Sequence, residues 1–178
     1  MKIDPLFLKG DFLRTPTPIW FLLAIIIPIL HQIYVVVCWR LELFYNSISK
    51  KYGASGFNLF KVGFAFLFIS RLLTIIVVAI SNAKTLNLNV YIAYLIAGLL
   101  FIPAVYVLYS VKKYFGFDRA IGIDHFQPEK FKNEPFVNKG IFKYTSNGMY
   151  IYGLLVLWIP GFLSVSYTHL TLPTICSV

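Results

Sequence analysis

The chain alternates long apolar stretches with shorter polar ones, and three apolar stretches are long enough to cross a lipid bilayer. A helix needs about 20 apolar residues to cross a hydrocarbon core of about 30 Å. Three stretches carry at most one charged residue each, and a fourth apolar run lies near the end: residues 18–38, 62–80, 90–109 and 149–163. The pattern predicts an all-α, polytopic membrane helix bundle. We expect four spans, the fourth incomplete, and at least one more in the natural protein.

Composition supports a membrane protein. The chain is 58% hydrophobic and 13% charged, with a mean hydropathy of +0.74, whereas soluble domains are about 25% charged. The net charge of +9 does not indicate nucleic-acid binding, because the cations lie in loops between apolar runs and form no basic stripe. The sequence shows no coiled-coil heptad, no disulfide framework and no spacing typical of metal ligands.

The cations predict how the loops are arranged. Two loops separated by two spans hold most of them, so the two loops should lie at the same end of the bundle. These cations are Arg40, Lys50, Lys51, Lys61, Lys112, Lys113, Arg119, Lys130, Lys132, Lys139 and Lys143. The first of these loops contains a single acid, Glu42. By the positive-inside rule we expect both loops, and the segment that follows the second, on the cytoplasmic face.

Residues 140–153 lie where the second basic loop meets the fourth apolar run. Ser146 and Asn147 are good helix-capping residues, so a helix is expected behind them. A capped helix start offers free N–H groups that suit a carboxylate or phosphate. Aromatic side chains surround this point and suit a cation; they are Phe142, Tyr144, Tyr150 and Tyr152. The segment therefore predicts one pocket for both ends of a zwitterionic ligand.

The same segment resembles the signature of membrane methyltransferases of the isoprenylcysteine carboxyl methyltransferase and phospholipid N-methyltransferase type. That pattern runs Gly-x-aromatic-basic-Tyr-x-Arg-His/Asn-Pro-x-Tyr-x-x-Gly. The matching residues are Gly140, Phe142, Lys143, Tyr144, Asn147, Tyr150 and Gly153. Two positions depart from it, since Ser146 replaces Arg and Gly148 replaces Pro. The lost Arg removes a bidentate partner for a carboxylate.

The resemblance implies an enzyme that transfers a methyl group from S-adenosylmethionine to a lipid-soluble acceptor. That acceptor would be a phospholipid amine or a prenylcysteine-like carboxylate in the membrane. The residues implied in cofactor binding are Gly140, Tyr144, Asn147, Tyr150 and Gly153. The family's return helix and acidic tail, which follow its signature, are not in this chain, so we expect the chain as given to be inactive. The resemblance identifies no catalytic base and no metal.

Two residues outside the segment are candidate substrate contacts. Arg71 interrupts a membrane span, where a charge costs at least about 2.5 kcal/mol, so it should face the bundle or water. Arg71 would bind an acidic group of substrate or cofactor, or else partner polar groups such as His31 and Gln32. His125 follows Asp124 in the second basic loop, a pairing suited to proton transfer. Because adjacent loop residues rarely face each other, we expect a solvated or capping role for His125.

Two other functions fit the sequence. A nicotinamide-dependent membrane reductase of the sterol type has a similar C-terminal signature. A non-catalytic scaffold or transporter component would instead use Arg71, His31 and Gln32 to line a polar path. Binding of S-adenosylmethionine, of nicotinamide, or of neither separates the three functions.

The last residues differ from what precedes them. Residues 165–174 resemble the reading-frame translation of a transposase adapter used in preparing sequencing libraries, and polar β-forming residues replace the apolar run. We therefore expect residues 1–163 to form one truncated membrane domain. Residues 164–178 are then a non-native tail.

Overall fold

The structure is a computed structural model, and it describes residues 8–166 and 168–170. A small hairpin of β1 (Asp11–Phe12) and β2 (Thr15–Pro16) precedes the helices. Three helices are long: α1 (Thr17–Tyr45), α3 (Gly56–Ser81) and α4 (Val90–Ser110). The short elements are α2 (Ser47–Tyr52), η1 (Gly53–Ser55), η2 (Val111–Phe115), α5 (Phe117–Ile121), η3 (Ile123–His125), α6 (Pro128–Phe131), η4 (Gly140–Lys143), α7 (Gly148–Gly153), η5 (Leu154–Leu157) and α8 (Ile159–Ser164).

The helix-bundle prediction is confirmed. Three helices are long and apolar enough to cross a membrane: Thr17–Tyr45, Gly56–Ser81 and Val90–Phe115, the last including the π turn η2. The fourth apolar helix, Gly148–Ser164, is shorter. The expectation of a continuous helix there is corrected, because α7, η5 and α8 divide it into a helical turn, a 3₁₀ segment and a second helical turn.

Helix α1 runs seven residues past the boundary that the apolar pattern predicts. It ends only at Asn46, which adopts a left-handed conformation with φ 50° and ψ 35°. Asparagine tolerates this conformation better than most residues. The helix continues through Arg40 and Glu42, because charged residues mark the end of an apolar run but do not stop a helix.

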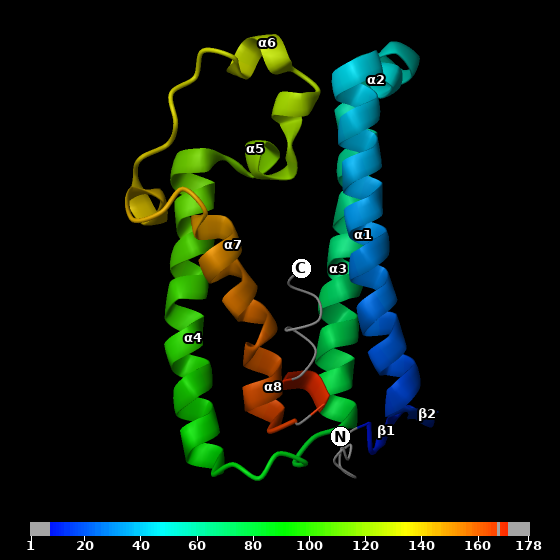
Figure 1. Cartoon of the computed structure of the whole chain (residues 1–178), viewed down its shortest axis with the longest axis vertical. Helices are drawn as coiled ribbons and strands as arrows, with labels where there is room; N and C mark the ends of the chain where they lie inside the picture. The colour runs from blue at the N-terminus through cyan, green and yellow to red at the C-terminus, as the bar shows by residue number, and fades with distance from the viewer. Residues whose placement is uncertain (1–7, 167, 171–178) are drawn as a thin grey trace, which may run out of the picture.

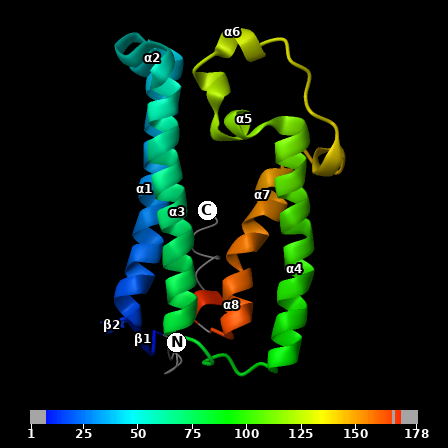
Figure 2. The same ribbon diagram turned by 180° about the vertical axis from the view of Figure 1, so that it is seen from behind.

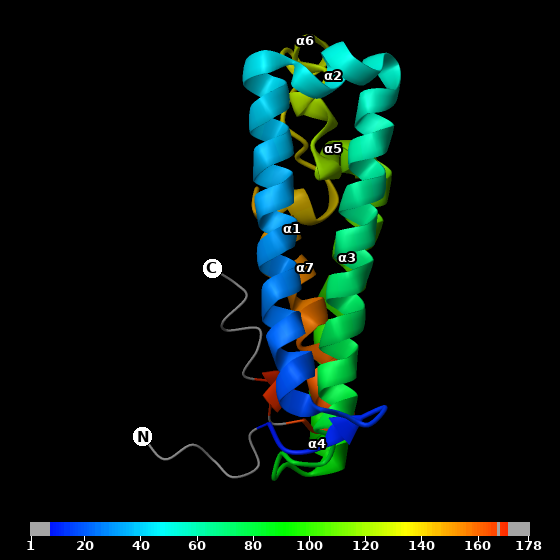
Figure 3. The same cartoon turned by 90° about the vertical axis from the view of Figure 1, so that its right-hand side faces the viewer.

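Helices α1 and α3 form an antiparallel hairpin joined by α2 and η1 (Figures 1 and 3). Along the middle of α1 and the second half of α3, buried positions recur at spacings of three and four residues, as in a coiled-coil seam. On α1 these are Ala24, Pro28, His31 and Val35, and on α3 they are Arg71, Thr74, Val78 and Ser81, with Ile75 and Ala79 buried beside them. The sequence did not reveal this seam, because both faces of each helix are apolar and only the buried positions carry the period.

Helix α4 pairs with the fourth helix on the other side of the bundle. Figures 1 and 2 show α7 against α4 and α8 approaching the lower end of α3. Small buried residues, Ala93, Ala97 and Ala104, lie along α4 and permit close helix approach. Leu157 of η5 completes a buried cluster with Ala24, Ile75 and Val78, so the fourth helix joins α4 to the hairpin.

Part of the segment expected to be a non-native tail packs into the bundle. The ring nitrogens of the buried His169 lie 3.1 Å from the Ile75 carbonyl oxygen and 2.7 Å from that of Leu157. The backbone N–H of Thr168 donates to Asn82 Oδ1 at 2.8 Å. The foreign origin of this tail stays a prediction.

The two basic loops meet at one end of the bundle, as predicted (Figure 1, top). Lys61 Nζ lies 2.6 Å from Asp118 Oδ1. The Trp39 and His125 rings stack with centroids 4.4 Å apart, and Phe126 packs against Phe57 at 5.3 Å. Which side of a membrane this end faces stays a prediction.

The Lys61–Asp118 ion pair should contribute little to stability. Its side chains are 37% and 51% exposed, and exposed ion pairs contribute about 0–1 kcal/mol. We expect Lys61→Ala to lower the free energy of unfolding in detergent micelles by less than about 1 kcal/mol. A larger loss, measured by helical circular dichroism, would show that this pair and not the aromatic packing fastens the second loop.

Candidate functional site

The segment that resembles the methyltransferase signature, residues 140–153, begins in tight contact with the end of α4. Gly140 has φ +61°, and a Cβ there would lie 2.6 Å from Ser110 Oγ and 2.9 Å from the Tyr114 ring. The backbone N–H of Ile141 donates to the buried Ser110 Oγ at 3.1 Å. Only glycine fits this approach, so this contact fixes where the segment starts.

Other residues of the segment also serve packing. Phe142 is buried and stacks on Phe115 at 5.3 Å. Gly148 is buried, and a Cβ there would lie 3.0 Å from the Ile141 side chain. A Cβ on Gly153 would meet only Val107, at an ordinary 3.8 Å. Gly140 and Phe142 therefore hold the start of the segment against the end of α4 and η2, and Gly148 allows the segment to pack on its own Ile141.

The polar and aromatic members of the segment lie on its outer side. Tyr144 is 73% exposed and Tyr150 is 65% exposed. Lys143, Ser146 and Asn147 are also exposed. The structure thus leaves three of the five candidate cofactor residues, Tyr144, Asn147 and Tyr150, outside the packed core.

The capping prediction is wrong. Asn147 occupies the position before α7, but its side chain accepts no capping hydrogen bond. Its backbone has φ −91° and ψ 21°, whereas a capping side chain requires an extended backbone at that position. Its own N–H donates to Thr145 Oγ1 at 3.2 Å. Because α7 has only six residues, its start offers no substantial helix dipole to a carboxylate.

The expected ring of aromatic side chains around the helix start is also divided. Phe142 and the half-buried Tyr152 pack in the cluster with Val107 and Val111 of α4 and η2. Tyr144 and Tyr150 remain outside. The segment therefore presents two exposed tyrosine faces and not an aromatic enclosure.

Arg71 lies in the α1–α3 seam, as predicted for a charge within a membrane span. It is 9% exposed and close enough to His31 for the two side chains to interact electrostatically. The His31 ring packs edge-on against Phe64, with centroids 4.7 Å apart. Arg71 and His31 therefore both lie on the inward side of the hairpin, whereas Gln32 is exposed.

His125 lies at a different place. Its Nδ1 is 3.1 Å from Asp124 Oδ1, so the expectation that these neighbours do not face each other is wrong. Stacking on Trp39 turns the ring toward its own neighbour. The adjacent Phe126 packs on Phe57, and Arg71 follows 14 residues later on α3, about 21 Å at 1.5 Å per residue. The two candidate substrate residues therefore do not share one site.

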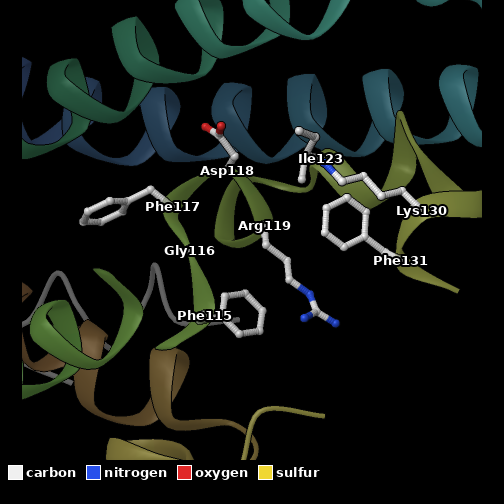
Figure 4. A pocket seen from close by; sticks show the side chains of 8 residues that line it. All are labelled: Phe115, Gly116, Phe117, Asp118, Arg119, Ile123, Lys130 and Phe131. Atoms are coloured by element: carbon white, nitrogen blue, oxygen red, sulfur yellow. The ribbon is translucent and has the colours of Figure 1, made fainter. Parts of the chain in front are cut away.

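Sequence reasoning did not reveal a hollow in the second basic loop, which we call the loop hollow (Figure 4). It has a volume of about 370 Å³. Its principal lining residues are Phe115, Phe117, Arg119, Ile123, Lys130 and Phe131. A second hollow of about 400 Å³ adjoins it through Arg119 and Phe131 and carries Asp124 and Glu129. None of the five candidate cofactor residues lines either hollow.

Comparison of the chain with known protein families, with curated proteins and with solved structures found no match. Within residues 8–166 and 168–170, no group of three His, Cys, Asp or Glu side chains is arranged to hold a metal ion. The functional argument therefore depends on residues 140–153 and their surroundings.

Proposed function

We propose that the chain binds S-adenosylmethionine at residues 140–153 and is of the membrane methyltransferase type, acting on a lipid-soluble acceptor. The observation that carries the proposal is that some residues of this segment pack against the helices while others remain exposed. Gly140 and Phe142 hold the backbone against the end of α4 and η2, and Gly148 packs on Ile141 within the segment, while Tyr144 and Tyr150 are exposed. A rigid backbone that presents polar and aromatic groups not needed for packing is typical of a binding segment.

The exposed groups suit the charges of this cofactor. S-adenosylmethionine supplies an electrophilic methyl group on a positively charged sulfur. The faces of Tyr144 and Tyr150 attract a cation. The exposed Lys143 supplies a positive charge for a carboxylate, in place of the arginine that the signature has at position 146. These residues therefore bind and orient the cofactor, with no cap from Asn147.

Binding and methyl transfer should be separable in this chain. Transfer requires alignment with the acceptor and exclusion of water. Tyr144 and Tyr150 are too exposed to exclude water. We therefore expect cofactor binding with no methyl transfer to lipid by the chain as given. Radiolabelled methyl transfer into membrane lipids, measured beside S-adenosylmethionine binding by the same preparation, tests this expectation.

The tyrosines provide the direct test of the site. An exposed cation–π contact contributes about 0.5–1 kcal/mol, so replacing Tyr144 and Tyr150 together by Ala should weaken S-adenosylmethionine binding about 5–30-fold. S-adenosylhomocysteine has a neutral sulfur in place of the positively charged one. Its dissociation constant should therefore change much less in the double variant. Tyr91→Ala is the matched control, since Tyr91 is 80% exposed at the far end of α4. Dissociation constants come from equilibrium dialysis of the chain in neutral detergent.

Three results of this test would count against the proposal. Unchanged binding in the double variant would place the cofactor elsewhere. Binding of a nicotinamide cofactor and not of S-adenosylmethionine would favour the reductase. Binding of neither cofactor would favour a non-catalytic membrane protein. The exposure of Tyr144, Asn147 and Tyr150 would then account for the absence of cofactor binding.

A further inference from the structure

We propose that the loop hollow binds the phosphate of an anionic phospholipid headgroup. This inference is independent of cofactor binding, because the hollow contains none of the candidate cofactor residues. Two cationic side chains, Arg119 and Lys130, line it together with the aromatic side chains of Phe115, Phe117 and Phe131 (Figure 4). Cations beside apolar rings suit a ligand whose charged end is attached to a hydrocarbon body.

Arg119 is held in place for such a contact. Its guanidinium lies 5.2 Å from the Phe115 ring centroid and 5.6 Å from that of Phe131. Its Nη1 donates to Glu134 Oε2 at 3.0 Å. A guanidinium carries five N–H donors, so the bond to Glu134 leaves others for a phosphate. Because the rings already restrict the Arg119 side chain, it loses little conformational entropy when a ligand binds.

Lys130 supplies the second charge. Its Nζ lies 5.6 Å from the Phe131 ring centroid. Among the ion pairs of the described residues, none includes Lys130. Its ammonium group is therefore available to an external anion.

The carboxylate that lines the hollow does not cancel these charges. Asp118 points away from Arg119 and Phe131, toward the long helices (Figure 4), and pairs with Lys61 at 2.6 Å. Glu134 offsets one of the other two cations. One positive charge remains uncompensated around the hollow. The adjoining hollow is lined by two acids, Asp124 and Glu129, beside Arg119 and Lys132, so its charges cancel and it suits an anion less well.

The position of the hollow favours a lipid over a soluble phosphate. The apolar helix Val90–Phe115 has 26 residues, a length of about 39 Å at 1.5 Å per residue. That length exceeds a hydrocarbon core of about 30 Å and reaches into the headgroup layers. Phe115, its last residue, lines the hollow. The hollow therefore lies at the depth of lipid phosphates, and the half-exposed Phe117 is placed to contact the glycerol and upper acyl chains.

The test is binding of fluorescently labelled phosphatidylglycerol to the full chain in neutral detergent micelles, followed by anisotropy. Each cation near an anionic lipid contributes a factor of about five, so Arg119→Gln with Lys130→Gln should raise the dissociation constant at least tenfold. Lys50→Gln with Lys51→Gln removes the same charge at the same end of the bundle, outside the hollow, and should change it less than threefold. Unlabelled phosphatidylglycerol should compete, and phosphatidylcholine should not.

Three outcomes would overturn the proposal. Equal weakening in both double variants would mean general attraction to the basic end and no site. Competition by millimolar inorganic phosphate would make the ligand a soluble phosphate. Unchanged binding in Lys130→Gln, which breaks no ion pair and should fold normally, would remove Lys130 from the site even if the Arg119 variant misfolds.

Discussion

Replacing Gly140 by Ala should lower the free energy of unfolding by about 2–6 kcal/mol. The residue has φ +61°, a conformation in which a non-glycine residue is strained by about 1–3 kcal/mol. The added Cβ would also lie 2.6 Å from Ser110 Oγ and 2.9 Å from the Tyr114 ring. Overpacking of this kind costs about 1–3 kcal/mol. Both neighbours lie at the end of α4, so the segment must move away from that helix or the helix must shift.

A matched variant separates conformational strain from steric contact. Gly53 has φ +59°, and nothing lies within 4 Å of the position of its Cβ. Gly53 has ψ −141°, so Gly53→Ala should cost only the backbone strain, about 1–3 kcal/mol. Unfolding in mixed detergent, followed by helical circular dichroism, gives both values. Equal losses in the two variants would show that the contact with Ser110 and Tyr114 contributes nothing, and the anchoring of the segment on α4 would be wrong.

Gly140→Ala also bears on function. If residues 140–153 bind S-adenosylmethionine, a displaced backbone should weaken binding even though the glycine contributes no side chain. Gly53→Ala should leave the affinity unchanged, since it lies in the connection between α2 and α3. The pair of variants thus connects the packing of the segment to its proposed role.

The long helices were predictable from the sequence because a membrane leaves few alternatives. An uncharged stretch of about 20 residues must satisfy its own backbone hydrogen bonds in lipid, and a helix does so without partners. The inward position of His31 and Arg71 followed from the cost of exposing such groups to lipid, whereas Gln32, the other polar residue that the sequence offered as a partner of Arg71, is exposed. His31 and Arg71 are both buried in the hairpin seam. The helix ends were less predictable, since α1 continues past the apolar run to a left-handed Asn46.

The packing of the helices was not predictable in the same way. Pairing of α1 with α3 depends on which of many apolar residues face inward, and hydrophobicity does not distinguish them. The same limit applies to the loop hollow. Phe115, Arg119 and Phe131 come together only because η2, α5 and α6 fold back on one another. Sequence spacing gave no sign of that contact.

The segment at residues 140–153 was predicted in part. Gly140 was identified as the first residue of the signature, and its positive φ and close contact with Ser110 show why a glycine stands there. Capping by Asn147 was not observed, because a capping residue type does not determine the backbone conformation that capping needs. The buried Phe142 and the exposed Tyr144 lie two residues apart. Only the three-dimensional contact with α4 and η2 shows which residues of the segment serve packing and which are free to contact a ligand.

The second large effect is expected at Glu42, which the sequence presented only as the lone acid of a basic loop. Its side chain is completely buried. Oε2 accepts from the backbone N–H of Ile48 at 2.9 Å and of Ser49 at 3.2 Å. These two donors belong to the first turn of α2, where N–H groups have no partner within the helix. Glu42 thus fixes the turn that reverses the chain between α1 and α3.

Glu42→Ala should lower the free energy of unfolding by about 2–4 kcal/mol, because a hydrogen bond to a charged group contributes about 1.5–3 kcal/mol. Glu42→Gln retains one carbonyl acceptor and should lose less. The exposed Glu129 serves as the control, and Glu129→Ala should change stability by less than about 0.5 kcal/mol. If Glu42→Ala were as stable as that control in detergent unfolding, the hairpin would be held by its seam alone. The hydrogen bonds from Ile48 and Ser49 to Glu42 would then be a consequence of the fold and would not help to determine it.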